Sequence, residues 1–215
     1  MNAARARRHG LAGLEFLEGI PGSVGGALRM NAGAMGAATF DRVEHIRFMD
    51  FGGGLHQLPT TEVHAKYRSC PLLKDNIALG AVFKGEPASP EEIAEKMKQF
   101  CGKRWNSQPA APSAGCIFKN TPLMPAGKLV DELCLKGLRV GGAAVSDVHG
   151  NFIVNDNKAT ARDVLNLIEI VRQKVRDMRG IDLETEVEIV GEDSPKNSTA
   201  SELIAKHSPD LLETK

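Results

Sequence analysis

The chain has 215 residues with 27 basic and 27 acidic side chains, so its net charge is zero with histidine neutral. This balance removes the electrostatic argument for a protein that binds nucleic acid or a membrane surface. Hydrophobic residues make up 42% of the sequence, enough for the core of one large domain or two small ones. No run approaches the roughly 20 apolar residues of a membrane-spanning helix, so we expect no membrane partner.

The first residues are basic, but no apolar run with a cleavage site follows them, which argues against a secretory signal. The cysteines, Cys70, Cys101, Cys116 and Cys134, form no C-x-x-C pair and no zinc-type spacing. The six histidines show no H-x-x-x-H or similar ligand pattern. We therefore expect a cytoplasmic protein with reduced thiols and no metal.

Glycines are dense between residues 19 and 36, where they let the backbone turn tightly and approach a ligand closely. The runs 42–50 and 53–59 flank the turn FGGG and predict a β-hairpin. The run 76–85 predicts a further strand.

A helix is predicted to begin after Ser89, the expected N-cap, because Pro90 suits the first helical position and Glu92 completes a capping box. Ile93, Met97 and Phe100 then recur at helical spacing. The Pro/Ser-rich stretch before this helix marks a domain boundary.

The second half of the chain mixes helices and strands. The stretch AGKLVDELCLKG predicts a short helix that ends at Gly137, and the runs 138–146 and 151–155 predict strands joined by a turn. The strongest helix signal begins at the N-cap Thr160, continues with Asp163 and ends at Gly180.

Residues 181–191 alternate between apolar and acidic side chains, which predicts a strand with one acidic face. Such a face is usually solvated, although one of its carboxylates could project into a cleft. The short mixed elements together predict an α+β fold. We expect domains at 1–86 and 87–191, followed by a polar tail at 192–215.

Three motifs carry candidate chemistry, and each also has a structural interpretation. Backbone N–H groups of GIPGSVGGA could cradle a pyrophosphate, but the pattern matches neither a Walker loop nor G-x-G-x-x-G, and alone it favours a tight turn. Arg68 has a planar fork suited to a carboxylate or phosphate, yet alone it favours a surface arginine.

The third motif is Cys116, which precedes Lys119 and Asn120. A thiol near cations can transfer protons, whereas most free cysteines are small buried hydrophobes. The other cysteines fit that second role, with Cys101 and Cys134 on the apolar faces of predicted helices.

Taken together and in this order, the motifs resemble the family of UDP-N-acetylenolpyruvoylglucosamine reductase, also called UDP-N-acetylmuramate dehydrogenase. The matching stretches are GLEFLEGIPGSVGGALRMNAGAMG, YRSCPL, QPAAPSAGCIFKN, AGKLVDELCLKGLRVGGAAVSDVHGNFIVN and LETEVEIVG. They extend from about Gly10 to Gly191. The compact YRSC form resembles the shorter subclass, which lacks an extra loop over the substrate.

The resemblance implies a FAD-binding domain of the vanillyl-alcohol-oxidase type, followed by an α+β substrate-binding domain. It implies that NADPH reduces the FAD, which then reduces UDP-N-acetylglucosamine enolpyruvate to UDP-N-acetylmuramate, a peptidoglycan precursor. We expect a monomer. Family members carry a first part of the FAD domain that this sequence does not contain, so we expect a shortened chain with impaired FAD binding and activity.

The resemblance assigns three catalytic residues. Arg68 would hold the substrate carboxylate and stabilise the developing enolate. Glu186 would hydrogen-bond that enolate, as a buried carboxylic acid can. Cys116 stands where the family usually has serine and would protonate C2, because a thiol is a stronger acid than a hydroxyl.

The resemblance also assigns binding residues. Those expected at the substrate are Tyr67, Arg104, Lys119, Asn120 and His149. Those expected at FAD are Gly19, Ile20, Pro21, Gly22, Ser23, Gly26, Asn31, Ala32 and Gly33.

Two alternatives remain open from the sequence. The chain could bind a UDP-sugar without redox chemistry. It could instead be a thiol redox protein that uses Cys116, which is less favoured because no second cysteine lies nearby in the sequence.

Overall fold

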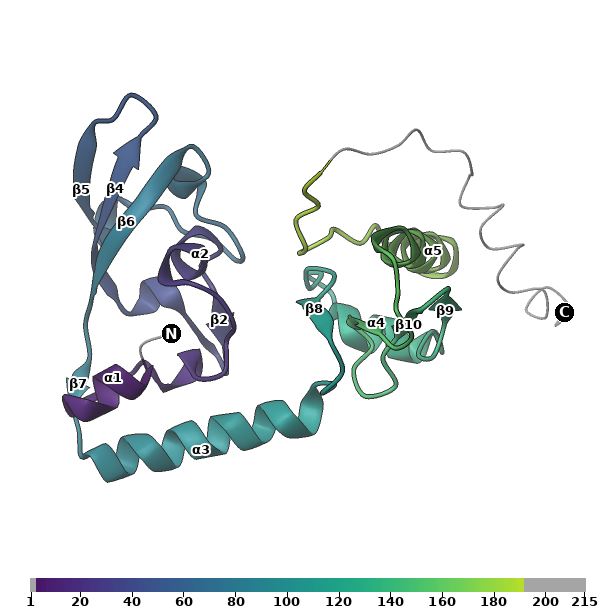
Figure 1. Cartoon of the computed structure of the whole chain (residues 1–215), viewed down its shortest axis with the longest axis horizontal. Coiled ribbons are helices and arrows are strands. Elements are labelled where there is room, and N and C mark those ends of the chain that lie inside the picture. The colour runs from purple at the N-terminus through teal and green to yellow at the C-terminus, as the bar shows by residue number, and fades with distance from the viewer. Residues whose placement is uncertain (1–2, 192–215) are drawn as a thin grey trace, which may run out of the picture. The chain divides into compact units, whose positions relative to one another are not determined.

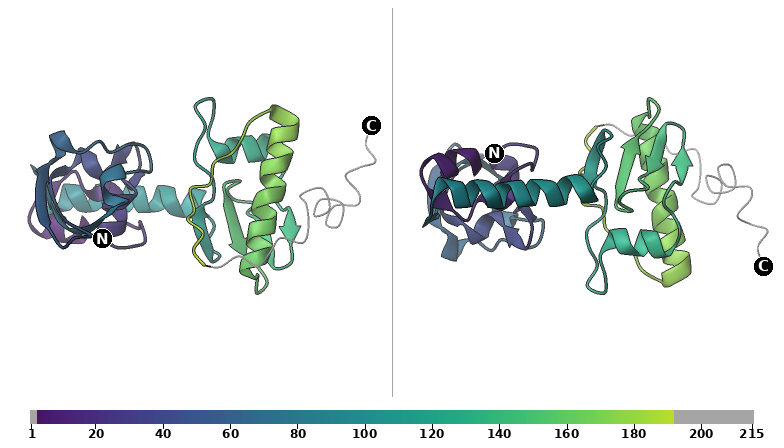
Figure 2. Two further views of the ribbon diagram at one scale, coloured as in Figure 1. Left: turned by 90° about the horizontal axis from the view of Figure 1, so that it is seen from above. Right: turned by 90° about the horizontal axis from the view of Figure 1, so that it is seen from below.

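The computed structural model describes residues 3–191, and Figures 1 and 2 show its elements. The predicted polar tail at 192–215 lies outside the described residues. The chain divides into two compact units, one up to Asn106 and the other from Ser107. Both contain helices and antiparallel sheets, so the predicted α+β content is confirmed.

The first unit contains a three-stranded antiparallel sheet in the order β5-β4-β6 and two strand pairs, β1-β7 and β2-β3. Its strands are β1 (Leu11–Ala12), β2 (Gly33–Ala34), β3 (Ala37–Ala38), β4 (Val43–Asp50), β5 (Leu55–Pro59), β6 (Asn76–Phe83) and β7 (Glu86–Pro87). Its helices are α1 (Ala3–Arg8), α2 (Val24–Arg29) and α3 (Pro90–Ser107), with short 3₁₀ turns η1 (Glu15–Leu17), η2 (Thr39–Asp41), η3 (Thr60–Glu62) and η4 (Pro71–Leu73).

The predicted hairpin is formed by β4 and β5, with FGGG as its turn. One face of the sheet is buried because Ile46 and Phe48 of β4 pack with Leu28 of α2 and Leu73 of η4. Cys70, fully buried beside them, is the small core residue that its sequence context predicted. This packing places α2 and the preceding glycine-rich segment against the sheet.

Helix α3 has the predicted capping box, in which Ser89 and Glu92 exchange hydrogen bonds of 3.2 Å each. We expected α3 to open the second domain, whereas the contacts divide the chain at its last turn. The reason lies in its apolar face: Ile93 and Met97 are buried against Ala3 of α1. The assignment of domains to 1–86 and 87–191 stays a prediction.

The second unit contains a four-stranded antiparallel sheet in the order β8-β11-β10-β9. Its strands are β8 (Ser113–Cys116), β9 (Arg139–Val140), β10 (Ala143–Val145) and β11 (Phe152–Asn155), and its helices are α4 (Ala126–Glu132) and α5 (Ala161–Arg179). Helix α5 lies along one side of this sheet, as the two views of Figure 2 show. The core between them includes Val145, Ile153, Leu167 and Val171.

Helix α5 begins and ends as predicted. Thr160 and Asp163 form the capping box, with the Asp163 N–H donating to the Thr160 hydroxyl at 3.1 Å and the Thr160 N–H donating to the Asp163 carboxylate at 2.8 Å. Gly180 ends the helix with a left-handed φ of 65°, a conformation that glycine adopts without steric cost. The boundaries of the longest helix therefore follow from its caps.

Replacing Thr160 with alanine should lower the free energy of unfolding by about 1 kcal/mol, because the cap oxygen for the Asp163 N–H is lost. Thr61→Ala is the control, since Thr61 is exposed and should change stability by less than about 0.5 kcal/mol. Urea unfolding of both variants measures the difference. Equal stability of the two variants would contradict the capping argument.

Two sequence predictions in the second unit are wrong. The helix expected to end at Gly137 ends at Glu132, because Cys134 has a left-handed φ of 54° that an α-helix does not accommodate. Cys134 is consequently exposed and is not the buried residue that we predicted.

The strand predicted at 181–191 is also absent from the described structure, which has only an isolated bridge between Phe118 and Thr185. A ladder needs successive bonds along both segments, but the partner segment leaves the sheet after Cys116. Leu183 is buried in the core, whereas Ile189, expected on the same face of the strand, is 59% exposed. The alternation is thus realised over only part of the run.

Candidate functional site

The glycine-rich segment of the first unit forms an exposed turn that leads into α2. The Ser23 hydroxyl caps α2 by accepting from the Gly26 N–H at 3.1 Å. Gly22 has a φ of 118°, and a Cβ at this position would meet nothing within 4 Å, so the backbone here is open to close approach. A Cβ at Gly19 would lie 3.2 Å from Nε of Arg104. The structure thus places Arg104 of α3 against this turn.

A second group of predicted residues in this unit is also brought together. The Asn31 amide donates to the Lys66 carbonyl at 3.1 Å, and its oxygen accepts from the Phe40 N–H at 3.1 Å. The Arg68 guanidinium donates to the Gly33 carbonyl at 3.3 Å. Two residues expected at FAD therefore contact the turn that carries the expected catalytic arginine.

That turn is tight. Lys66 and Ser69 are bonded through both backbone N–H groups, at 2.7 and 3.2 Å, and Arg68 has a left-handed φ of 52°. The guanidinium lies over the Tyr67 ring, 5.1 Å from its centroid. A non-glycine residue in this conformation costs about 1 kcal/mol or more and is often found at a functional site. The turn therefore presents Arg68 at an energetic cost.

In the second unit, two distant stretches of the chain run side by side. The Lys119 N–H donates to the Glu184 carbonyl at 2.8 Å, and the Glu186 N–H donates to the Ile117 carbonyl at 2.7 Å. Lys119 and Glu184 also form an ion pair through their side chains. The segments that carry the expected proton donor Cys116 and the expected glutamate Glu186 are therefore hydrogen-bonded to each other.

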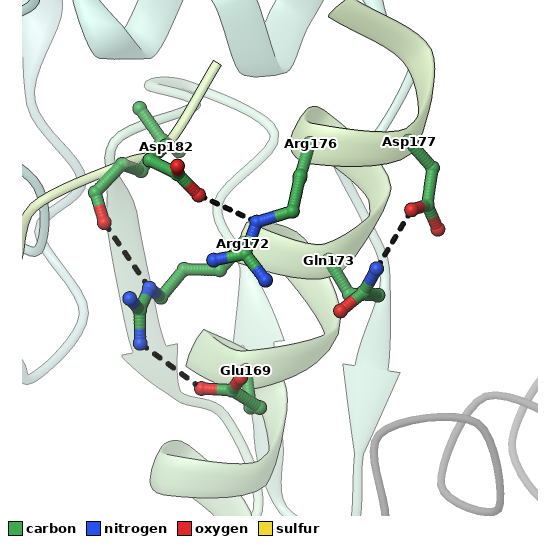
Figure 3. Close-up of polar contacts among 7 residues, drawn as sticks. Glu169, Arg172, Gln173, Arg176, Asp177 and Asp182 are labelled. Carbon is green, nitrogen blue, oxygen red and sulfur yellow. Dashed lines mark hydrogen bonds and ion pairs between the residues drawn. The ribbon is translucent and has the colours of Figure 1, made fainter. Parts of the chain in front are cut away.

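The stretch that carries Glu186 is anchored to α5 by arginines that the sequence analysis did not single out (Figure 3). Nε of Arg172 donates to the Leu183 carbonyl at 3.1 Å, while its Nη1 lies 3.2 Å from the Glu169 carboxylate. Arg176 forms an ion pair with Asp182. Together with the burial of Leu183, these bonds fix the chain that leads to Glu186.

A cavity of about 330 Å³ in the second unit collects three of the predicted residues, Cys116, Asn120 and His149. The Asn120 oxygen accepts from the Ala126 N–H at 3.0 Å, which holds the side chain at the start of α4. Three charged residues of the lining were missed from the sequence: Lys128, Asp131 and Lys136. Lys136 pairs with Asp131 at 2.8 Å, and no spacing pattern in the sequence shows that α4 and the turn after it bring these residues to the cavity.

His149 has a defined hydrogen-bonding state. Its Nδ1 accepts from the Asn151 N–H at 3.1 Å, so the neutral ring carries its proton on Nε2. Burial, assisted by the positive charge of Lys136, lowers its pKa below the ordinary value of 6.5. His149 is therefore a neutral hydrogen-bond donor at neutral pH.

Titration of His149 followed by NMR should give a midpoint below 6.5. Because the unfolded state then binds this proton more tightly, this histidine should make stability fall as the pH drops through about 6.5. A midpoint for His149 at or above 6.5 would contradict the buried neutral form.

Two negative findings apply to residues 3–191 only. In this range no group of three or more histidine, cysteine, aspartate or glutamate side chains is arranged to hold a metal ion. None of the helices in the described part is long and apolar enough to cross a membrane.

Known proteins match the chain along most of its length. Residues 108–190 match the family model described as UDP-N-acetylenolpyruvoylglucosamine reductase, C-terminal domain. A UDP-N-acetylenolpyruvoylglucosamine reductase of Bacillus pumilus is 43% identical over 195 residues, which cover 89% of this chain and 64% of the relative. One of Chloroherpeton thalassium is 44% identical over 199 residues, which cover 88% and 63%.

A solved structure is also similar. The crystal structure of UDP-N-acetylenolpyruvylglucosamine reductase from Thermus caldophilus superposes with a TM-score of 0.77 at 41% identity, over 86% of this chain and 67% of that chain. The chain spans 64% and 63% of the length of the two curated relatives, slightly less than two thirds. On the identity and coverage of these matches, the chain belongs to the UDP-N-acetylenolpyruvoylglucosamine reductase family.

Proposed function

We propose that the chain acts with FAD and NADPH to reduce UDP-N-acetylglucosamine enolpyruvate to UDP-N-acetylmuramate, which supplies peptidoglycan synthesis. The observation that carries this proposal is the hydrogen-bonded pairing of the Cys116 and Glu186 segments beside the 330 Å³ cavity. In this proposal the protein is a cytoplasmic monomer. Its first unit is part of a FAD-binding domain of the vanillyl-alcohol-oxidase type, and its second unit binds the substrate.

The residues of the first unit fit FAD. The backbone at Gly22 is open to close approach, and glycine-rich turns with free N–H groups suit a pyrophosphate. Ser23 and Gly26 hold the turn at the start of α2, while Asn31 and Gly33 contact the turn of Arg68. When bound, FAD supplies a hydride that it has received from NADPH.

Arg68 is the proposed partner of the substrate carboxylate. Hydride addition to C3 of the enolpyruvyl group leaves negative charge on C2 and the attached carboxylate. A guanidinium matches a carboxylate with two parallel N–H groups and stays charged throughout. Arg68 would therefore stabilise the charge that develops, which is how enzymes lower such barriers.

Cys116 is the proposed proton donor to C2, and Glu186 is the proposed hydrogen-bond partner of the enolate. An ordinary thiol, with a pKa of about 8.5, keeps its proton at neutral pH and can release it to a carbanion-like carbon. The backbone hydrogen bond between Glu186 and Ile117, 2.7 Å long, joins the segments of Cys116 and Glu186. It therefore supports a role for Cys116 and Glu186 in the same step.

The remaining predicted residues are proposed to bind the UDP-sugar. Asn120 and His149 line the cavity, and His149 offers its Nε2–H as a donor. Lys119 and Arg104 supply positive charge for the diphosphate, and Tyr67 lies beside Arg68. Neutral donors combined with a few cations suit a ligand that is part sugar and part phosphate.

A second candidate is a UDP-sugar-binding protein without redox activity, favoured by the observation that the cavity of the second unit is lined by Cys116, Asn120 and His149 from that unit alone. FAD titration of the purified chain, followed by flavin absorbance and calorimetry, separates the two. Stoichiometric binding of FAD, with bleaching by NADPH, supports the reductase. Binding of UDP-N-acetylglucosamine enolpyruvate without FAD supports the second candidate, and binding of neither contradicts both.

A further inference from the structure

Asn151 is one of only four buried polar or charged residues within residues 3–191, with 2% of its surface exposed. Both polar groups of its side chain form hydrogen bonds with the same residue, Phe118. The amide nitrogen donates to the Phe118 carbonyl at 2.8 Å, and the oxygen accepts from the Phe118 N–H at 2.9 Å. A side chain that completes both backbone bonds of another residue acts as a short piece of strand.

These bonds lie at the centre of the paired segments. Phe118 stands between Ile117, whose carbonyl accepts from Glu186, and Lys119, whose N–H donates to Glu184. The backbone carbonyl of Asn151 also accepts from the Ile117 N–H at 2.9 Å. Asn151 therefore holds the chain after Cys116 on the side opposite to the Glu186 stretch.

The same residue fixes His149. The Asn151 N–H donates to Nδ1 of that ring at 3.1 Å, which directs the remaining proton to Nε2. The loop between them is held by a second buried residue, Ser146, whose hydroxyl accepts from the Val148 and His149 N–H groups at 3.1 and 3.3 Å. One buried asparagine thus connects the proposed proton donor with a wall of the cavity.

We propose that Asn151 is a positioning residue of the reaction. Its side chain sets the place of Cys116 relative to the Glu186 stretch through Phe118, while its backbone N–H sets the donor orientation of His149. The effect of Asn151 on the rate of the reaction rests on the proposed function. Its effect on the order of the backbone around Phe118 does not. A misplacement of about 1 Å in a catalytic group can cost about 100-fold in rate.

The first test compares Asn151→Leu with Val175→Ala in the full chain. Leucine has a similar size and no polar group, while Val175 is a buried core residue of α5 whose side chain makes none of these hydrogen bonds. The two variants are compared where their melting temperatures have fallen by the same amount. The rate of amide hydrogen exchange at Phe118, Lys119 and Glu186 should then rise at least about 10-fold in Asn151→Leu and stay unchanged in Val175→Ala. Equal exchange in the two variants overturns the proposal.

The second test uses Asn151→Asp. A protonated carboxyl keeps one donor and one acceptor, whereas a buried carboxylate would face the Phe118 carbonyl, so the pKa of the new acid should be raised. If the pKa of this acid is higher in the folded state than its unfolded value of about 3.9, the acid contributes stability that is fully present below about pH 3.9. This contribution is lost as the pH rises through the folded pKa.

The melting-temperature gap between Asn151→Asp and the unmodified chain should therefore narrow as the pH falls from about 8 to about 5. The unmodified chain is measured over the same range because other titratable groups line this cavity, namely Cys116, Lys128, Asp131, Lys136 and His149. A gap that does not change with pH overturns the two-bond arrangement.

A kinetic comparison tests the part that concerns reaction. With FAD bound, Asn151→Leu should lower the rate of substrate-driven flavin reoxidation about 10- to 100-fold and leave the KM for NADPH unchanged. In Asn151→Asp the reoxidation rate should recover as the pH falls, because the protonated carboxyl keeps one donor and one acceptor. Altered exchange with unaltered reoxidation would make Asn151 purely structural and overturn the proposal. Absence of turnover in the unmodified chain would instead count against the proposed function, while exchange still tests the backbone role.

Discussion

Replacing Cys116 with alanine should slow the reoxidation of reduced flavin by UDP-N-acetylglucosamine enolpyruvate about 10²- to 10⁴-fold, the usual contribution of a general acid. Reduction of the flavin by NADPH should keep its rate, because no proton transfer to C2 takes part in it. Rapid mixing of the FAD-loaded protein with each reactant separates the two half-reactions. The backbone bond that joins the Cys116 and Glu186 segments through Ile117 and Glu186 should remain, since it uses no side chain.

Two further cysteine variants make this result specific. Cys116→Ser should keep most of the activity, because a hydroxyl can also donate a proton. Cys134→Ser should change neither half-reaction, since Cys134 is an exposed thiol of the same unit outside the cavity. Normal reoxidation in Cys116→Ala would remove this thiol from the reaction.

Replacing Arg68 with glycine should change activity and stability in different ways. Turnover should fall about 10²- to 10³-fold, because the group that stabilises the developing charge is lost. The free energy of unfolding should change by less than about 1 kcal/mol. Glycine relieves the left-handed φ of 52°, and this gain offsets the lost contacts with Gly33 and Tyr67.

Arg68→Ala is the matched variant for this experiment. It should lose the same activity but also destabilise the protein, because alanine keeps the strained φ without the contacts. Steady-state kinetics and urea unfolding of both variants give the four values needed. Equal stability of the two variants, or activity retained in either, would contradict the roles assigned to the turn.

Elements with local signals could be predicted from the sequence. The caps at Thr160 and Ser89 located the starts of α5 and α3, and FGGG located the turn between β4 and β5. These signals work because caps and turns satisfy backbone groups within a few residues. The prediction of a strand at 181–191 was wrong for the opposite reason. A strand needs a neighbouring segment to pair with, and the alternation of side chains does not show how long that segment is.

The site was predictable only in part. Motif resemblance selected Cys116, Asn120 and His149, and the structure places all three around one cavity. It gave no role to Asn151 or Arg172, whose contributions arise from bonds to Phe118, 33 residues away, and to Leu183, 11 residues away. Such contacts follow from tertiary packing and have no local pattern.

One measurement tests the proposed reduction most directly. The FAD-loaded chain is reduced with one equivalent of NADPH without oxygen and then mixed with UDP-N-acetylglucosamine enolpyruvate. We expect the flavin absorbance to return while an equal amount of UDP-N-acetylmuramate forms. Flavin that binds and is reduced, but stays reduced in the presence of this substrate, would contradict the proposed function.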